Sequence, residues 1–273
     1  MRQIKLAIVI ILILFTCMVI DDAYIYLQHQ GVFDYLRFLW PTAQVGWADL
    51  PQATSLERCT DAPFVVPTDG WIGVIYGDSI LGTVNHSGLD IFGLEENGVT
   101  PVYVAYDGFL TRLPNWKSAV VIRHPEDPIK PSRQIWSYYA HMADEEGNSY
   151  IVEQIPPGTY ELPVKQGMLL GYQGDYNGGA WRSVSTHLHF SIILSDEKGK
   201  FLNETDILNT LDPSPYFGMR LNSQCADRPP ACRQDFLCTG SLGFSGGYDR
   251  QSKSSRIVTR RTSFEPKEVS FRR

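Results

Sequence analysis

The chain has 273 residues, a length that allows one or two domains, and 43% hydrophobic against 20% charged residues exclude a largely disordered protein. Its 24 Lys and Arg against 30 Asp and Glu give a formal net charge of −6, which argues against a dedicated nucleic-acid-binding protein. The 14 Tyr, 13 Phe and 6 Trp, together with 23 Gly and 17 Pro, are typical of a protein rich in β-strands and turns.

Residues 1–20 have the pattern of a membrane-targeting segment. Arg2 and Lys5 precede an apolar run over residues 6–20, and two acidic residues follow it. A basic start before an apolar run is typical of a secretory signal, and this run is shorter than the ~20 residues of an ordinary spanning helix. No small-x-small cleavage site follows, so we expect a signal-anchor in preference to a cleaved signal peptide. The charges on its two sides predict that the rest of the chain lies outside the cytoplasm, membrane-anchored or secreted.

A linker is expected at residues 21–60, followed by one β-rich domain at residues 61–221. Short apolar runs separated by turn residues predict strands in this domain, and no long helical periodicity is present. The expected strands are residues 102–105, 118–123, 135–140, 167–172 and 188–193. We also expect long loops at residues 125–133 and 143–162, and one helical turn at residues 206–211. The predicted fold class is therefore all-β, mostly antiparallel, with little helix.

Beyond the domain, we expect a Cys-rich extension at residues 222–239 and a basic tail at residues 240–273. The tail holds eight Lys or Arg against three acidic residues. A solvated, disordered tail is the preferred interpretation, and an arm that binds anionic wall polymer or lipid is the alternative.

Five cysteines bear on the compartment of the protein. Cys17 lies in the apolar run, and four others lie in the part expected to be exported: Cys59, Cys225, Cys232 and Cys238. An even number in an oxidising compartment predicts two disulfides, with three possible pairings. One arrangement ties Cys59, which precedes the domain, to the segment that follows it.

Three short motifs contain four of the six histidines. They are H-S-G-L-D at residues 86–90, Y-A-H-M at residues 139–142 and T-H-L-H-F at residues 186–190. On a strand, His187 and His189 share a face because they are two residues apart. His86 and Asp90 are about 13 Å apart on a straight strand, and a bend at Gly88 would let both reach one ion. Two imidazoles and one carboxylate with an open position are typical of a catalytic zinc site.

In this order, the motifs resemble those of the lysostaphin/LytM-type zinc metallopeptidases of bacterial cell walls, whose pattern is H-x-G-x-D, Y-A-H-L and H-L-H-F. The resemblance covers residues 65–217 and implies an antiparallel β-sheet groove, of the duplicated hybrid-motif type, with one Zn²⁺ on its floor. The family's zinc ligands fall on His86, Asp90 and His189. Its catalytic histidines fall on His141 and His187.

For function, the resemblance implies a zinc-dependent endopeptidase that hydrolyses peptide cross-links of peptidoglycan outside the cytoplasmic membrane. The expected partners are peptidoglycan peptide and, through the N-terminal segment, the membrane; no nucleic acid is expected, and the protein is expected to be a monomer. The alternative is a regulatory or wall-binding LytM-like module that activates other wall hydrolases without cleaving. All five site positions carry the expected residue type, which favours the hydrolase. The sequence leaves open which of His141 and His187 is the general base.

Overall fold

The structure is a computed structural model that describes residues 52–59, 61–80, 84–178 and 184–224. The expected membrane-targeting segment, most of the linker, nearly all of the Cys-rich extension and the whole basic tail lie outside these residues, as do Cys17, Cys225, Cys232 and Cys238. Within the described part of the chain, no helix combines the length and the apolar character needed to cross a membrane. Cys59 is disulfide-bonded, and its partner lies outside the described residues.

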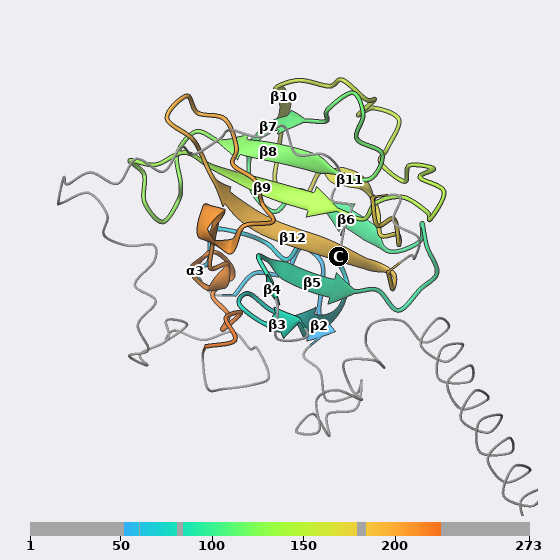
Figure 1. The fold of residues 1–273 in the computed structure, drawn as a ribbon, viewed down its shortest axis with the longest axis horizontal. Coiled ribbons are helices and arrows are strands. Elements are labelled where there is room, and N and C mark those ends of the chain that lie inside the picture. The colour runs from blue at the N-terminus through green and yellow to red at the C-terminus, as the bar shows by residue number, and fades with distance from the viewer. Residues whose placement is uncertain (1–51, 60, 81–83, 179–183, 225–273) are drawn as a thin grey trace, which may run out of the picture. The chain divides into compact units, whose positions relative to one another are not determined.

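The centre of the fold is a nine-stranded sheet with β12 in its middle (Figure 1). The strands follow one another in the order β1-β2-β5-β12-β9-β8-β7-β10, and β13 also pairs with β12. Their bounds are Gln52–Ala53 (β1), Gly70–Val74 (β2), Leu89–Phe92 (β5), His187–Leu194 (β12), Ile135–Ala140 (β9), Val120–His124 (β8), Gly108–Thr111 (β7), Leu162–Val164 (β10) and Thr210–Leu211 (β13). Each of these pairings is antiparallel, which confirms the predicted fold class.

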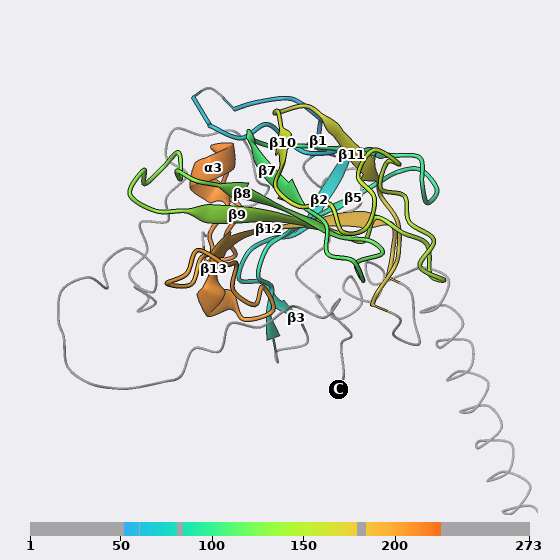
Figure 2. The ribbon, with the colours of Figure 1, turned by 90° about the horizontal axis from the view of Figure 1, so that it is seen from above.

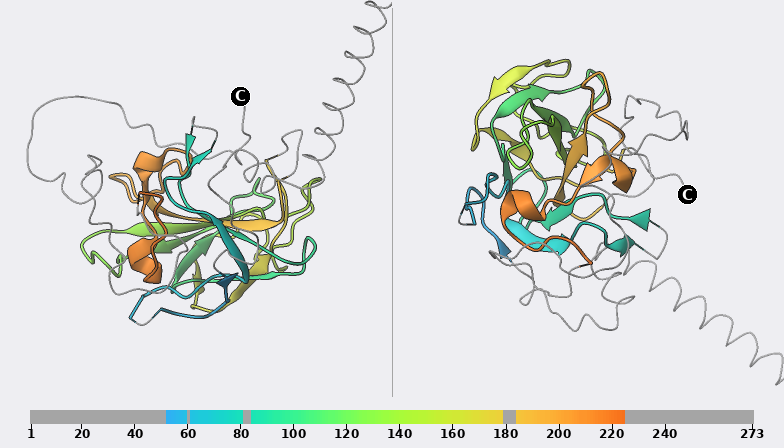
Figure 3. Two further views of the ribbon diagram at one scale, coloured as in Figure 1. Left: turned by 90° about the horizontal axis from the view of Figure 1, so that it is seen from below. Right: turned by 90° about the vertical axis from the view of Figure 1, so that its left-hand side faces the viewer.

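Two small sheets and two short helices complete the described elements. One sheet pairs β6 with β11 and the other pairs β3 with β4, and Figure 2 shows β11 and β3 on opposite sides of the layer formed by β8, β9 and β12. Figure 3 shows the helices at one end of the sheet. The bounds are Pro101–Tyr103 (β6), Leu169–Tyr172 (β11), Ser79–Ile80 (β3), Val84–Asn85 (β4), Ile207–Asn209 (the 3₁₀ helix η2) and Ser214–Phe217 (α3).

The five expected strands are all present, with ends that move by at most two residues. Eight further strands of the described residues are additional to them, namely β1, β2, β3, β4, β5, β7, β10 and β13. The expected long loops are also present and connect β8 to β9 and β9 to β10. The expected helical turn is wrong in its second half, because only Ile207–Asn209 is helical and Thr210–Leu211 instead pairs with Ile192 and Ile193 of β12.

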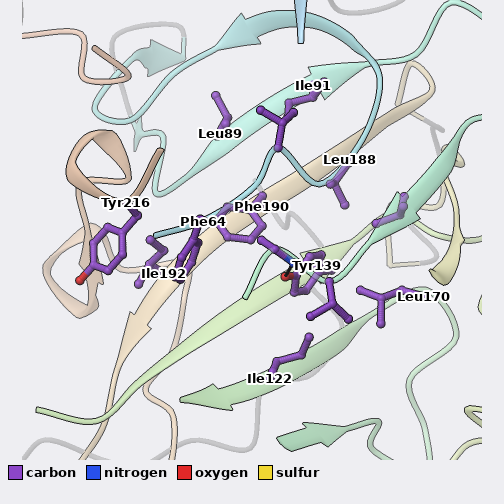
Figure 4. Close-up of a cluster of buried hydrophobic side chains, with 14 of the residues drawn as sticks. Phe64, Leu89, Ile91, Ile122, Tyr139, Leu170, Leu188, Phe190, Ile192 and Tyr216 are labelled. Atoms are coloured by element: carbon purple, nitrogen blue, oxygen red, sulfur yellow. Dashed lines mark hydrogen bonds between the residues drawn. The ribbon is translucent and has the colours of Figure 1, made fainter. Parts of the chain in front are cut away.

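The main core lies on one face of the sheet and fixes which side chains of β12 point the other way. Leu188, Phe190 and Ile192 are fully buried in this core, and Figure 4 shows them along β12, with Phe190 next to Tyr139 of β9 and Ile192 next to Phe64. Alternate residues of a strand face opposite sides. Burial of these three residues therefore places His187 and His189 together on the opposite face of the sheet.

Candidate metal centre

Three side chains from separate positions in the sequence converge on the face of β12 opposite the main core. His189 of β12 lies directly across from Asp90 of β5 in the antiparallel register, and its Nδ1 is 2.8 Å from Asp90 Oδ1. His86 comes from the loop before β5, and its Nε2 lies 3.1 Å from Asp90 Oδ1 and 3.1 Å from His189 Nδ1. One ligand atom from each residue thus lies within 4.8 Å of the others.

The bend expected at Gly88 is present, and it brings His86 back toward Asp90. Gly88 lies in a bend immediately before β5, and its backbone packs tightly against β12, because a Cβ there would lie 2.3 Å from the carbonyl oxygen of Phe190. The other ring nitrogen of His86, Nδ1, faces the carbonyl oxygen of Ile75 at 3.3 Å. This contact turns Nε2 toward Asp90 and His189.

The two remaining predicted histidines stand next to this group. The ring centroids of His141 and His187 are 4.4 Å apart, and those of His141 and His189 are 6.2 Å apart. His187 Nε2 lies 3.8 Å from Asp90 Oδ1, and the His187 ring stacks on Phe92 at 4.8 Å. The structure therefore brings together all five residues that the motifs single out; their roles as ligands and catalytic groups remain predictions.

Backbone carbonyls hold both of these rings by the same nitrogen. His141 Nδ1 lies 2.6 Å from the carbonyl oxygen of Tyr176, and His187 Nδ1 lies 2.6 Å from that of Ser185. A carbonyl oxygen only accepts hydrogen bonds, so Nδ1 carries the proton in each ring and Nε2 keeps its lone pair. His141 follows the last residue of β9 with a φ of 71°, a left-handed conformation that is uncommon outside glycine.

The pKa values in this cluster follow from burial and from neighbouring charges. Burial, with the charges of His187 and His189, lowers the pKa of His141 to about 3. Burial also lowers the pKa of His187, against the opposing charge of Asp90. Burial opposes ionisation of Asp90, but the charges of His86 and His187 and hydrogen bonds from His189 and His86 hold its pKa well below its usual range. Asp90 is therefore ionised and His141 and His187 are neutral near pH 7.

The donor set and its surroundings fit a zinc ion. Two imidazole nitrogens and one carboxylate oxygen form a typical three-residue shell of a catalytic zinc site. His86, Asp90 and His189 expose only 7%, 8% and 8% of their surfaces. A carboxylate this buried is costly unless a cation compensates it. Burial opposes protonation of His189, but hydrogen bonds to Asp90 and Glu204 raise its pKa to about 10, so a protonated ring supplies the positive charge that a bound zinc ion would supply in its place.

One residue that the sequence analysis missed also belongs to this cluster. Glu204, which follows the hairpin after β12, places Oε1 2.9 Å from His189 Nε2. Burial opposes ionisation of this carboxyl too, but its contact with His189 lowers its pKa. It lies 15 residues beyond His189 in an acidic and polar stretch, and no spacing rule of the three motifs points to it.

No protein-family model matches the chain, and no curated protein matches it. Among solved structures, it is similar to the catalytic domain of the antimicrobial peptidase lysostaphin from Staphylococcus simulans (22% identity, TM-score 0.33), over 54% of this chain and 90% of that domain. A lysostaphin-type structure is thus among those found to be similar, at low identity.

Two further structures are similar to the chain at comparable levels. The match to the longer lysostaphin structure from Staphylococcus simulans has 19% identity and a TM-score of 0.33, and it covers 60% of this chain and 55% of that one. The match to the catalytic domain of a mutant of the prophage-encoded M23 protein EnpA from Enterococcus faecalis has 20% identity and a TM-score of 0.32. It covers 55% of this chain and 96% of that one.

Proposed function

We propose that this protein is a zinc-dependent endopeptidase that hydrolyses peptide cross-links of peptidoglycan. The observation that carries the proposal is the convergence of His86 Nε2, Asp90 Oδ1 and His189 Nδ1 within 4.8 Å, with His141 and His187 beside them. The order H-x-G-x-D, Y-A-H and H-L-H-F, which resembles the lysostaphin/LytM-type pattern, supports a wall peptide as the substrate.

His86, Asp90 and His189 would hold the metal, and the chemistry that zinc supplies in such a site is Lewis acidity toward a water molecule and a peptide carbonyl. His141 and His187 each hold Nδ1–H against a carbonyl oxygen and leave the lone pair of Nε2 free. A neutral imidazole in this tautomer can accept a proton from water as it attacks the peptide carbonyl carbon.

The two rings can share the work of proton transfer. Once Nε2 of one ring has taken the proton, that ring is a cation with a new N–H donor, which can stabilise the developing oxyanion or protonate the leaving amine. Low pKa values ensure that both rings begin neutral near pH 7. His141 and His187 make the same kind of Nδ1 contact with a backbone carbonyl oxygen. Kinetic data on the two Ala variants would assign the general base to one of them.

Digestion of purified peptidoglycan by the full-length protein, with mass spectrometry of the fragments, tests the proposal. We expect new free amino groups at cleaved cross-links, and the masses identify the scissile bond. His189→Ala should lose both zinc and hydrolysis. His141→Ala and His187→Ala should retain zinc and lose hydrolysis by a factor of about 10²–10⁴, the usual contribution of a general acid or base.

Two results would contradict this function. Full activity of His141→Ala on wall peptides would remove that residue from the mechanism. Zinc-loaded protein that sediments with peptidoglycan but releases no amino groups would favour the regulatory or wall-binding module.

The proposal also places the domain outside the cytoplasmic membrane, anchored through residues 1–20 or released, and acting as a monomer without nucleic acid. Fractionation of expressing cells, followed by protease treatment of intact cells or spheroplasts, tests this placement. Recovery of the protein in the protease-resistant cytoplasmic fraction would contradict it.

A further inference from the structure

Behind His189, on the side away from Asp90, lies a buried carboxylate. Glu204 exposes 8% of its surface, and its Oε1 lies 2.9 Å from His189 Nε2. The same oxygen accepts a hydrogen bond of 2.9 Å from Ser87 Oγ. The separation between Glu204 Oε1 and His189 Nε2 is within hydrogen-bond distance, although the ring N–H of His189 is not aimed straight at the carboxylate oxygen.

These two contacts join the segments that carry the metal-binding atoms. Ser87 follows His86 directly in the first motif, and His189 belongs to the third. A carboxylate costs free energy to bury unless it is paired and hydrogen-bonded. Its position between a hydroxyl from one segment and an imidazole from the other therefore favours one arrangement of the two segments.

The chain places Glu204 by packing that does not involve the metal site. Asp196 accepts hydrogen bonds from the backbone N–H groups of Lys198 and Lys200, which closes the hairpin after β12. Phe201 then packs on Trp136, with ring centroids 5.3 Å apart. Leu202 is buried in the same apolar cluster, and its N–H bonds to a carbonyl oxygen of β12. Glu204 is thus held at His189 by the hairpin itself.

We propose that Glu204 is a positioning residue that directs Nδ1 of His189 toward the metal. A histidine that binds a metal through one nitrogen commonly gives the N–H of the other to a carboxylate, which fixes the tautomer and the orientation of the ring. Here Nδ1 is the atom that faces Asp90 and His86, and Nε2 is the atom that faces Glu204. The inference rests on the proposed metal site and assigns a residue that the three motifs do not contain.

Zinc affinity of the full-length protein, measured by competition with a chromophoric chelator, tests the role of Glu204. We expect Glu204→Ala to bind zinc 10- to 100-fold more weakly than wild type, as loss of such outer partners typically does. Glu204→Gln should lose less, because its amide oxygen can still accept from Nε2–H. Glu197→Ala removes an exposed carboxylate from the same hairpin and should leave the affinity unchanged.

A second readout separates a positioning role from a merely structural one. Cobalt substituted for zinc reports ligand geometry through its visible absorption, and we expect a changed spectrum in Glu204→Ala and an unchanged one in Glu197→Ala. Zinc affinity within twofold of wild type in both Glu204 variants would overturn the inference, even if their thermal midpoints fell. A wild-type protein that binds no zinc would instead overturn the proposed metal site, and the inference with it.

Discussion

Replacing Gly88 by Ala is expected to push apart the two segments that carry the proposed ligand atoms. A Cβ at this position would lie 2.3 Å from the Phe190 carbonyl oxygen and 3.0 Å from Cε1 of the His189 ring. Non-bonded carbon atoms normally rest about 3.5–4.0 Å apart, and a carbon and an oxygen slightly closer, so relief of the clash needs a movement of about 1 Å. The backbones of β12 and β5 each lie between two other strands and cannot yield easily, so the loop that carries His86 must move.

The size of this movement sets the expected effects. Overpacking of this kind typically lowers the free energy of unfolding by about 1–3 kcal/mol. Ligand distances in metal sites hold to within about 0.2 Å, and a displacement of 1 Å in an active site can lower the rate about 100-fold. We therefore expect Gly88→Ala to bind zinc at least ~10-fold more weakly and to release about 100-fold fewer amino groups from peptidoglycan.

Three measurements on one preparation test the prediction: urea unfolding, chelator competition for zinc and peptidoglycan digestion. Gly158→Ala is the matched control, because Gly158 has a φ of 89° but no atom within 4 Å of the added Cβ. Backbone strain should cost this control on the order of 1 kcal/mol of stability while its zinc affinity stays at the wild-type value. Wild-type zinc affinity and activity in Gly88→Ala would refute the claim that close packing of Gly88 on β12 sets the ligand geometry.

Two further predictions concern metal and pH. Zinc at a hundredfold excess over its dissociation constant should raise the free energy of unfolding by about 2.7 kcal/mol over protein in chelator, so identical thermal midpoints in the two conditions would argue against a metal site. Burial lowers the pKa of His124 from 6.5 to about 4. Between these values the unfolded chain binds the proton and the folded chain does not, so stability falls as pH falls, by about 1.4 kcal/mol per pH unit. In zinc-saturated protein, urea unfolding should show that His124 accounts for about 2 kcal/mol of the stability that wild type loses between about pH 6.5 and pH 5, and that His124→Gln lacks this part of the loss. Equal losses of stability in the two proteins would contradict this.

The shared face of the two β12 histidines could be predicted from the sequence, whereas the strand that carries Asp90 could not, for a physical reason. His187 and His189 flank Leu188 in a strand with clear alternation, and their shared face follows from that pattern. Strand β5 offers no such pattern, because its four residues, Leu89–Phe92, are too few to show a period and include a single polar side chain. Its identity as a strand depends on β2 and β12 at its two edges, which are distant in the sequence.

Glu204 was beyond prediction for a related reason. Its place beside His189 depends on a hairpin whose apolar residues, Phe201 and Leu202, pack on side chains of other strands. A sequence pattern reports periodicity within one element, whereas this contact arises from tertiary packing between elements. The second half of the helical turn expected at residues 206–211 is wrong for a similar reason, because Thr210–Leu211 pairs with β12 instead.

The partners of Nδ1 explain how neighbouring histidines of one strand can take different roles. His187 and His189 share a face, and spacing alone assigns neither of them to the metal or to proton transfer. The carbonyl oxygen of Ser185 holds Nδ1 of His187, so this ring presents Nε2 with its lone pair, 3.8 Å from Asp90 Oδ1. His189 has no carbonyl on Nδ1 within the described residues; that atom faces Asp90 at 2.8 Å, and Nε2 faces Glu204. In the H-x-H motif, the role proposed for each ring therefore follows from the group that holds its other nitrogen. A backbone carbonyl holds the ring proposed for proton transfer, and a carboxylate holds the ring proposed as a ligand.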